Sequence, residues 1–161
     1  MTNNNNKRKR EKMLVFNEND HIETPTELYQ ALDNIHHFDF DPCPLNCTEF
    51  DGLSVEWKQS NFVNPPFSKI SKWIKKGVEE LINNKRKSVF LITARVGNRY
   101  WFNYVWPFAS EIMFLNRIRF KNYKLVFPLP VAIVVFDPDK PPPVEREKEQ
   151  HLTPNITYYI A

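Results

Sequence analysis

Four consecutive residues, Asn64-Pro65-Pro66-Phe67, have the groups needed to hold a planar amino group. The Asn64 amide oxygen can accept one N–H, and the Pro65 carbonyl can accept the other because consecutive prolines fix the backbone. Phe67 offers a flat face on which a heterocyclic ring can stack. The four residues follow a short apolar run and precede a helical pattern, which is where open α/β sheets carry their chemistry.

Such a site would suit an exocyclic amine like N6 of adenine, which is a poor nucleophile because its lone pair is delocalised into the ring. Two acceptors on its hydrogens favour a pyramidal nitrogen whose lone pair points outward. A methyl sulfonium placed there can be attacked in line, so that positioning and electrostatics supply most of the catalysis. An ordinary proline-rich turn before a helix is the competing interpretation, and a short motif alone does not decide between them.

The elements that would position this turn follow from the hydrophobic pattern. We predict strands at residues 37–40, 61–63, 88–94, 111–115 and 131–136, and helices that begin near Thr24 and that span about 69–83 and 99–108. The continuous apolar run at 88–94 predicts a central, parallel strand. This alternation of strands and helices indicates a three-layer α/β domain. Residues 45–60 leave little room for a crossover helix, so the sheet is expected to lack a strand.

Three further polar positions stand near predicted strand ends or a helix start. Thr24 is a good N-cap, with Pro25 at the first helical position and Glu27 completing a capping box. An ordinary helix cap is the simpler interpretation. A helix N-terminus can also receive a carboxylate, so a ligand site is the alternative. Asp41, at the end of the first strand, can bind an ammonium or a ribose hydroxyl, or simply start a turn. Asp51 could accept a hydrogen bond from an adenosine, or it could be an exposed residue of a turn.

The composition sets limits on the class of protein. The chain has 161 residues, 42% of them hydrophobic, which is enough for one domain with a core. Only three glycines occur, which excludes G-x-G-x-x-G and Walker-type phosphate loops. No apolar segment resembles a signal peptide or could span a membrane, so we expect an intracellular protein. Cys43 and Cys47 match no standard zinc spacing; we expect reduced thiols and no metal site.

The chain divides into three parts by composition. Residues 1–12 are polar and basic and are expected to form a disordered arm, residues 13–137 the folded domain, and residues 138–161 a Pro-rich, mostly disordered tail. The net charge of +3 permits nucleic-acid binding without requiring it.

Several basic residues follow predicted strands and could contact a nucleic-acid backbone. A solvated surface is the alternative for each of them, particularly on the lysine-rich face of the helix at 69–83. The stretch at 116–121 alternates basic and apolar residues and is the best candidate for phosphate contact. The candidate residues are Lys69, Arg95, Arg117, Arg119 and Lys121.

The order of these segments carries more information than any one of them. Thr-Pro before a helix, a strand ending in Asp-Pro-Cys-Pro, then Asp-x-Leu, a Trp, Asn-Pro-Pro-Phe, a buried strand and Arg-x-Arg-Phe follow one another over roughly residues 20–136. This set resembles the small adenine-N6 DNA methyltransferases carried by phages. The resemblance implies a class I methyltransferase fold, which is a three-layer, Rossmann-like mixed sheet, here reduced in size. It also implies S-adenosylmethionine as the methyl donor and DNA as the acceptor.

The resemblance further implies roles for individual residues. Asn64, Pro65, Pro66 and Phe67 would hold the flipped adenine as the catalytic residues. The remaining residues would bind the cofactor: Thr24 and Pro25 at its methionine end, Asp41 and Pro42 in its pocket, and Asp51 at its adenosine part.

Two departures from the family pattern bear on function. No glycine loop follows the first strand, and no separate target-recognition domain is visible, so recognition must be weak or come from a partner chain or a homo-oligomer. The resemblance implies a virus-encoded protein of the cytoplasm or host nucleus. Methylation of RNA adenine or of protein glutamine, whose amide poses the same chemical problem, stays open, as does an inactive nucleic-acid-binding or scaffold domain of the same fold.

Overall fold

The computed structural model describes residues 22–121 and 125–140. The arm predicted at residues 1–12 and all but the first residues of the predicted tail lie outside this range. No helix of the described part is both long and apolar enough to cross a membrane. The elements in chain order are α2 (Thr26–His36), β1 (Ser60–Val63), the short 3-10 turn η1 (Phe67–Lys69), α3 (Ile70–Asn84), β2 (Lys87–Thr93), the wide helical turn η2 (Trp101–Val105), α4 (Trp106–Phe108), β3 (Glu111–Leu115) and β4 (Val131–Phe136).

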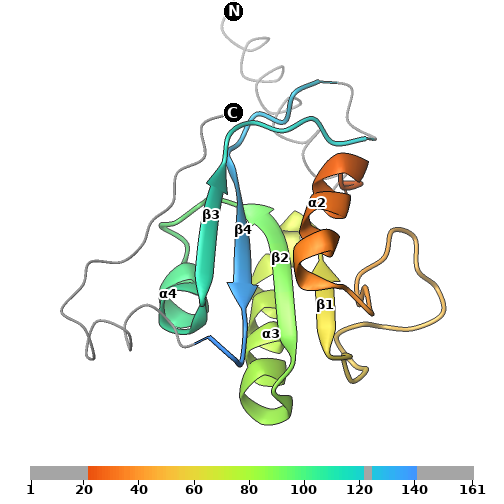
Figure 1. Cartoon of the computed structure of the whole chain (residues 1–161). Helices are drawn as coiled ribbons and strands as arrows, with labels where there is room; N and C mark the ends of the chain where they lie inside the picture. The colour runs from red at the N-terminus through yellow and green to blue at the C-terminus, as the bar shows by residue number, and fades with distance from the viewer. Residues whose placement is uncertain (1–21, 122–124, 141–161) are drawn as a thin grey trace, which may run out of the picture.

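The strands form one mixed sheet in the order β1-β2-β4-β3 (Figure 1). Strand β1 is parallel to β2, whereas β4 is antiparallel to both of its neighbours. Strands β1, β2 and β3 therefore point the same way and end at one edge of the sheet, at the top of Figure 1. The predicted mixed α/β class is confirmed, and β2 is internal as expected. The expectation that β2 is parallel holds on one side only, because β4 returns from β3 without a crossover.

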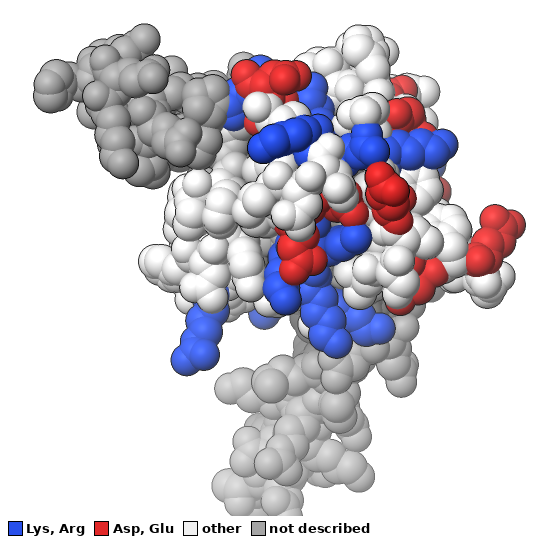
Figure 2. Space-filling view, turned by 90° about the horizontal axis from the view of Figure 1, so that it is seen from below, with Lys and Arg blue, Asp and Glu red and all other residues white. Residues whose placement is uncertain are grey.

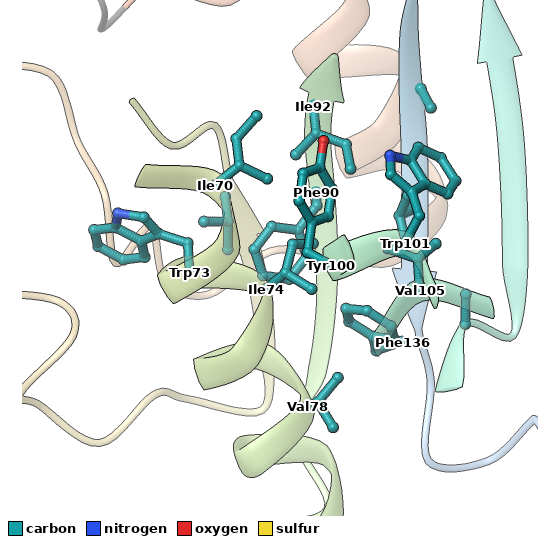
Figure 3. Close-up of a cluster of buried hydrophobic side chains, with 14 of the residues drawn as sticks. Ile70, Trp73, Ile74, Val78, Phe90, Ile92, Tyr100, Trp101, Val105 and Phe136 are labelled. Carbon is teal, nitrogen blue, oxygen red and sulfur yellow. The ribbon is translucent and has the colours of Figure 1, made fainter. Parts of the chain in front are cut away.

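Alternate side chains of each strand enter two separate cores. Phe90 and Ile92 of β2 pack with α3, η2 and β4 on one face, as Figure 3 shows. Val89 and Leu91 face the other side, where they pack with α2 and with the segment between β3 and β4. Full burial of each such side chain contributes about 1.5–3 kcal/mol. The sheet is thereby covered on both faces, while its upper edge is left to loops.

Helix α3 confirms the amphipathic pattern expected for residues 69–83. It buries Ile70, Trp73, Ile74 and Val78 against the sheet, and its lysines lie mainly on the outer face. The apolar stripe at helical spacing is what fixes the helix on the sheet. Its first turn lies next to the Asn-Pro-Pro-Phe segment, so this packing determines where that segment sits.

The strand predicted at residues 37–40 is wrong except at its last residue. Phe40 makes a single parallel bridge to β1. His37 has a left-handed backbone with φ 53° and ends α2. The N–H of Phe38 donates to the Asp33 carboxylate at 2.8 Å. The end of α2 thus gives His37 a left-handed backbone, which a strand does not allow. The bond to Asp33 occupies the Phe38 N–H, which a strand would need for pairing.

The cap predicted for α2 is also wrong. Pro25 rather than Thr24 is the N-cap residue, the helix begins at Thr26, and no side chain caps its N-terminus. The Thr24 hydroxyl instead accepts a hydrogen bond from Asn64 Nδ2 at 3.0 Å. A partner 40 residues away in the sequence has replaced the local one, and a local pattern cannot anticipate that.

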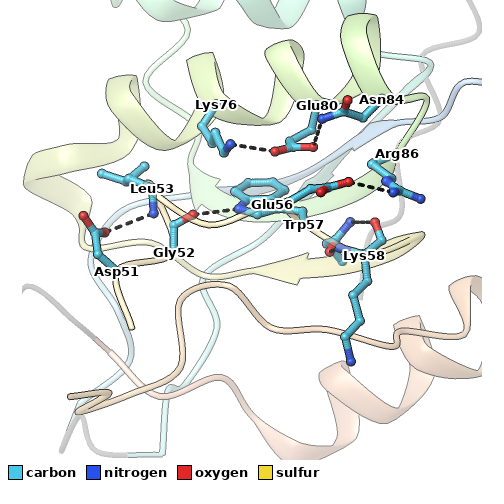
Figure 4. Close-up of polar contacts among 11 residues, drawn as sticks. Asp51, Gly52, Leu53, Glu56, Trp57, Lys58, Lys76, Glu80, Asn84 and Arg86 are labelled. Carbon is cyan, nitrogen blue, oxygen red and sulfur yellow. Dashed lines mark hydrogen bonds and ion pairs between the residues drawn. The ribbon is translucent and has the colours of Figure 1, made fainter. Parts of the chain in front are cut away.

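Residues 45–59 contain turns and no helix, as the length of this linker suggested. Figure 4 shows how the linker is anchored: Trp57 Nε1 donates to the Gly52 carbonyl at 2.7 Å. On α3 above it, the buried Glu80 carboxylate contacts Lys76 at 2.6 Å and Asn84 at 2.7 Å. Burial alone would raise the pKa of Glu80, but these contacts and a hydrogen bond from the backbone N–H of Trp57 outweigh it and leave the pKa lowered.

Gly52 lets the linker pass directly beneath the Asp41-Pro42 segment. A Cβ atom at Gly52 would lie 1.7 Å from the Pro42 carbonyl oxygen and 2.9 Å from the Trp73 ring. Gly52→Ala is therefore expected to lower the free energy of unfolding by about 1–3 kcal/mol, because backbone rather than a flexible side chain must move. Gly97→Ala is the matched control, since nothing lies within 4 Å of its Cβ position. Urea unfolding measures both; equal stabilities for the two variants would contradict this packing.

Candidate active site

A cavity of about 230 Å³ opens at the edge of the sheet where β1 ends. Its wall combines the start of α2, the residues after the Phe40 bridge and the first residue after β1. The lining residues are Ile22, Glu23, Thr24, Thr26, Tyr29, Asp41, Cys43, Leu45, Phe62, Asn64 and Lys121. The structure thus brings together three of the predicted site residues, Thr24, Asp41 and Asn64, from distant parts of the sequence.

Asn64 is 6% exposed and has a fixed orientation. Its Nδ2 donates to the Ile22 carbonyl at 2.5 Å and to the Thr24 hydroxyl at 3.0 Å. Because a carbonyl can only accept, the amide nitrogen must face Ile22, and the oxygen must face the other way. Within the part of the chain that the structure describes, this buried Oδ1 has no hydrogen-bond partner. An unpaired buried acceptor is costly and suits a donor brought by a ligand.

Asp41 is the second polar group of this cavity. Its Oδ1 accepts the N–H of Cys43 at 2.8 Å. None of the ion pairs among the described residues involves it. Burial raises the pKa of Asp41 to about 6, and the bond from Cys43 opposes this increase. A partly buried carboxylate without a cationic partner among the described residues is a favourable position for the ammonium of a ligand.

The other members of the Asn-Pro-Pro-Phe turn flank the cavity and do not line it. Pro65 is buried, and Pro66 precedes η1. Phe67 is half-buried, with its ring centroid 6.2 Å from that of Phe120 and 5.3 Å from that of Phe127. Both neighbouring rings are tilted against Phe67, so neither stacks face to face with it. The turn is therefore braced by the segment between β3 and β4.

The remaining residues predicted to bind a cofactor lie around the cavity at different distances. Pro25 precedes α2, and Pro42 is buried next to Asp41. Asp51 is exposed and lies outside the lining. Its carboxylate accepts the Leu53 N–H at 3.0 Å and the Ser54 hydroxyl at 2.9 Å, and these two bonds lower its pKa.

The five basic residues predicted to contact DNA gather at the same edge. Lys69 closes η1 after β1, Arg95 follows β2, and the other three follow β3, whose direction matches that of β1 and β2. All five are exposed, namely Lys69, Arg95, Arg117, Arg119 and Lys121. The strand ends thus place these residues on the side of the sheet where the cavity opens, and Lys121 lines the cavity itself.

The segment between β3 and β4 is joined to the start of α2 by one residue pair. Lys121 Nζ lies 3.0 Å from a Glu23 carboxylate oxygen, and the Lys121 N–H donates to the Glu23 carbonyl at 3.1 Å. Both residues line the cavity. An exposed pair of this kind contributes at most about 1 kcal/mol, so it can open when a charged ligand arrives.

The opposite edge of the sheet, where β1, β2 and β3 begin, bears charges of both signs. Figure 2 views the molecule from this side and shows Lys and Arg interspersed with Asp and Glu. Two ion pairs lie there, Arg86 with Glu56 at 3.0 Å and Lys87 with Asp137 at 3.2 Å. This mixture offers no uniform positive surface at that edge.

Sequence reasoning missed two groups that shape the cavity. The Ile22 carbonyl orients Asn64, and as a backbone group it carries no signal in the sequence. Tyr29 lies in the wall near Asp41, and burial, followed by the charges of Asp33 and Asp41, raises its pKa. Tyr29 stands three residues after Thr26, which also lines the cavity, so helical spacing was a usable signal that the two share a face.

The geometry is that of an α/β protein with a cavity at the carboxyl end of a parallel strand, the usual position of a ligand site in such sheets. A family model described as DNA N-6-adenine-methyltransferase (Dam) matches residues 12–126 of the chain. The protein belongs to this family, and its activity is methylation of the N6 amino group of adenine in DNA. The resemblance found in the sequence is thereby confirmed, and DNA adenine is favoured over the RNA, glutamine and inactive alternatives. No individually curated protein is significantly similar to the chain.

Proposed function

We propose that the protein uses S-adenosylmethionine as methyl donor and holds the target adenine at the Asn64-Pro65-Pro66-Phe67 turn. The observation that supports this most strongly is the Asn64 amide oxygen, which is buried and unpaired among the described residues at a cavity that also contains Asp41. A purely structural asparagine would have both ends of its amide bonded. Here one end is bonded twice to protein, and the other is available to a donor.

The chain's own residues then act by positioning. Asn64 Oδ1 accepts one hydrogen of N6, the Pro65 carbonyl accepts the other, and the Phe67 ring supports the base, which must leave the stack at a cost of a few kcal/mol. When bound, S-adenosylmethionine supplies a methyl group on a sulfonium sulfur that becomes a neutral thioether. In the transfer, the N6–methyl bond would form as the carbon–sulfur bond broke, and a proton of N6 would pass to water, so Asn64 and Pro65 need only hold the amine and no general base is required.

The polar groups of the cavity fit one end of this cofactor. Asp41 would pair with the ammonium of its methionine part, which explains why this partly buried carboxylate has no ion-pair partner among the described residues. A volume of about 230 Å³ is smaller than the roughly 300–1,000 Å³ of pockets that enclose whole ligands. The adenosine part would therefore lie along the surface, with Pro25 and Pro42 beside the cavity and the exposed Asp51 within reach of it.

The fold would be a shortened class I methyltransferase sheet, Rossmann-like and with helices on both faces. Among the described residues, its outer edge beside β1 carries only the single bridge at Phe40, where larger relatives would continue the sheet. The chain would act inside a cell, with a phage or other virus as its source. Residues 13–137 would form the catalytic domain, and target recognition would come from a partner chain or a second copy.

Contact with the DNA backbone would come from the exposed basic residues at the upper edge. They follow three strand ends on the side of the sheet where the cavity opens, so a duplex lying there would present one nucleotide to Asn64. Lys121 would exchange Glu23 for a phosphate. Such contacts position the DNA without reading its sequence, and their strength should fall steeply with salt.

Radiolabelled methyl transfer tests the proposal. With tritiated S-adenosylmethionine, the purified chain is expected to label an adenine-containing DNA duplex and to leave a matched RNA and a glutamine-containing peptide unlabelled. Digestion of the DNA product to nucleosides should place the label on N6-methyladenine. Labelling of RNA or peptide in preference to DNA, or no binding of S-adenosylmethionine in a calorimetric titration, would contradict it.

A further inference from the structure

We infer that Thr24 is a positioning residue, which works with the Ile22 carbonyl to fix the Asn64 amide so that its oxygen faces the substrate. This inference rests on the proposed function of Asn64 and adds a residue whose task is to orient it. The direct observation is the pair of hydrogen bonds from Nδ2, to the Ile22 carbonyl at 2.5 Å and to the Thr24 hydroxyl at 3.0 Å.

The two bonds determine which atom of the Asn64 amide is presented. An amide nitrogen has two hydrogens, and both are used. If the amide turned over, its oxygen would meet the Ile22 carbonyl oxygen, and the nitrogen would present hydrogens to a substrate N–H, which cannot accept them. The orientation that allows Asn64 to accept from adenine is therefore the one that the segment before α2 enforces.

Because its hydroxyl is bonded to Asn64, Thr24 does not cap the helix that follows it. It stands where a helix cap is expected, yet no side chain caps α2. A hydroxyl that accepts from Asn64 also keeps its own hydrogen for another acceptor. A residue two positions before α2 thus connects the start of this helix to Asn64, the first residue after β1.

Replacing the hydroxyl by a methyl group of the same shape tests this role. Thr24→Val is expected to lower kcat about 10-fold, as loss of one hydrogen bond to a buried amide allows, while the Kd for S-adenosylmethionine stays within about twofold of that of the unaltered protein. Thr24→Ser restores the acceptor and should restore kcat. Thr48→Val, at an exposed position outside the cavity, is the control and should behave like the unaltered protein.

Two further measurements separate positioning from a general structural effect. In an Asn64→Ala background, Thr24→Val should have no additional effect on the residual rate, because its target is gone. In the free protein, the side-chain NH2 hydrogens of Asn64 should exchange with solvent faster in Thr24→Val than in Thr24→Ser, as NMR can measure without cofactor.

The outcomes distinguish this inference from the proposed function. An active Asn64→Ala variant would overturn the proposed function itself. An inactive Asn64→Ala variant together with a fully active Thr24→Val variant would overturn only the positioning role. A raised Kd for S-adenosylmethionine with unchanged kcat in Thr24→Val would also overturn it, since Thr24 would then be a cofactor ligand.

Discussion

Asn64→Ala is expected to lower kcat by about 10²–10³-fold, the usual effect of removing one preorganised hydrogen bond from a reacting group. The variant loses the acceptor that faces the cavity, together with the two Nδ2 bonds to Ile22 and Thr24, and leaves β1 unaltered. Binding of S-adenosylmethionine should change little, because Asp41 is unaltered. Single-turnover methylation of a DNA duplex at saturating cofactor measures the effect directly.

A second buried asparagine on the same strand provides the control. Asn61 has every amide group bonded: its oxygen accepts the Lys58 N–H at 3.0 Å, and its nitrogen donates to the carbonyls of Lys58 and Lys87 at 2.9 and 2.7 Å. Asn61→Ala should reduce stability by about 1–3 kcal/mol and leave kcat of the folded protein unchanged. Equal loss of kcat in both variants would show that Asn64 acts only through the fold.

Asp41→Asn is expected to weaken binding of S-adenosylmethionine by about 10–100-fold, since a charge-assisted bond to the ligand ammonium is lost. In the unaltered protein the affinity should also depend on pH. Burial raises the pKa of Asp41 to about 6 in the free protein, and a bound ammonium would lower it. Binding should therefore weaken as the pH falls below about 6 and level off above it. Calorimetric titrations between pH 5 and 8 measure this, and Asp41→Asn should lack the dependence.

The Asp41 carboxylate also affects the stability of the free protein, and here the pH dependence has the opposite sign to that of cofactor binding. The pKa of Asp41 is higher in the folded protein than the roughly 3.9 of an unfolded chain, so the folded state binds more protons between these values. Stability therefore falls as the pH rises through this window and stays lower above it. Asp41→Asn should stabilise the free protein by about 1–3 kcal/mol at pH 7 and weaken cofactor binding at the same time. A destabilised variant with intact cofactor binding would show that Asp41 has a structural role instead.

The sequence determined the elements whose hydrophobic period was clear. The stripe of Ile70, Trp73, Ile74 and Val78 predicted α3, and the β-branched run at 131–136 predicted β4, because burial against the sheet requires those patterns. The segment at 37–40 has an alternating pattern as well, but the competing bond from Phe38 to Asp33 is a local interaction that the pattern does not report. The directions of the strands beside β2 were predicted only in part, because the residues of β4 do not indicate in which direction that strand runs.

The candidate site was predictable as residue types and only partly as geometry. Asn64 and Asp41 could be chosen because an amide and a carboxylate at strand ends suit the chemistry, and the structure brings both to one cavity. The bond between Thr24 and Asn64 could not be predicted, since it joins positions 40 residues apart and replaces an ordinary helix cap. The Ile22 carbonyl could not be predicted either, because every residue has one.

A crystal structure with S-adenosylhomocysteine tests the central claim most directly. The product is expected in the cavity between Thr24, Asp41 and Asn64, with its amino group at the Asp41 carboxylate and its sulfur turned toward the Asn64 amide oxygen. That oxygen should remain free of protein partners. Density for the product elsewhere, or an Asn64 oxygen bonded to the protein's own groups, would contradict the assignment of this pocket to methyl transfer.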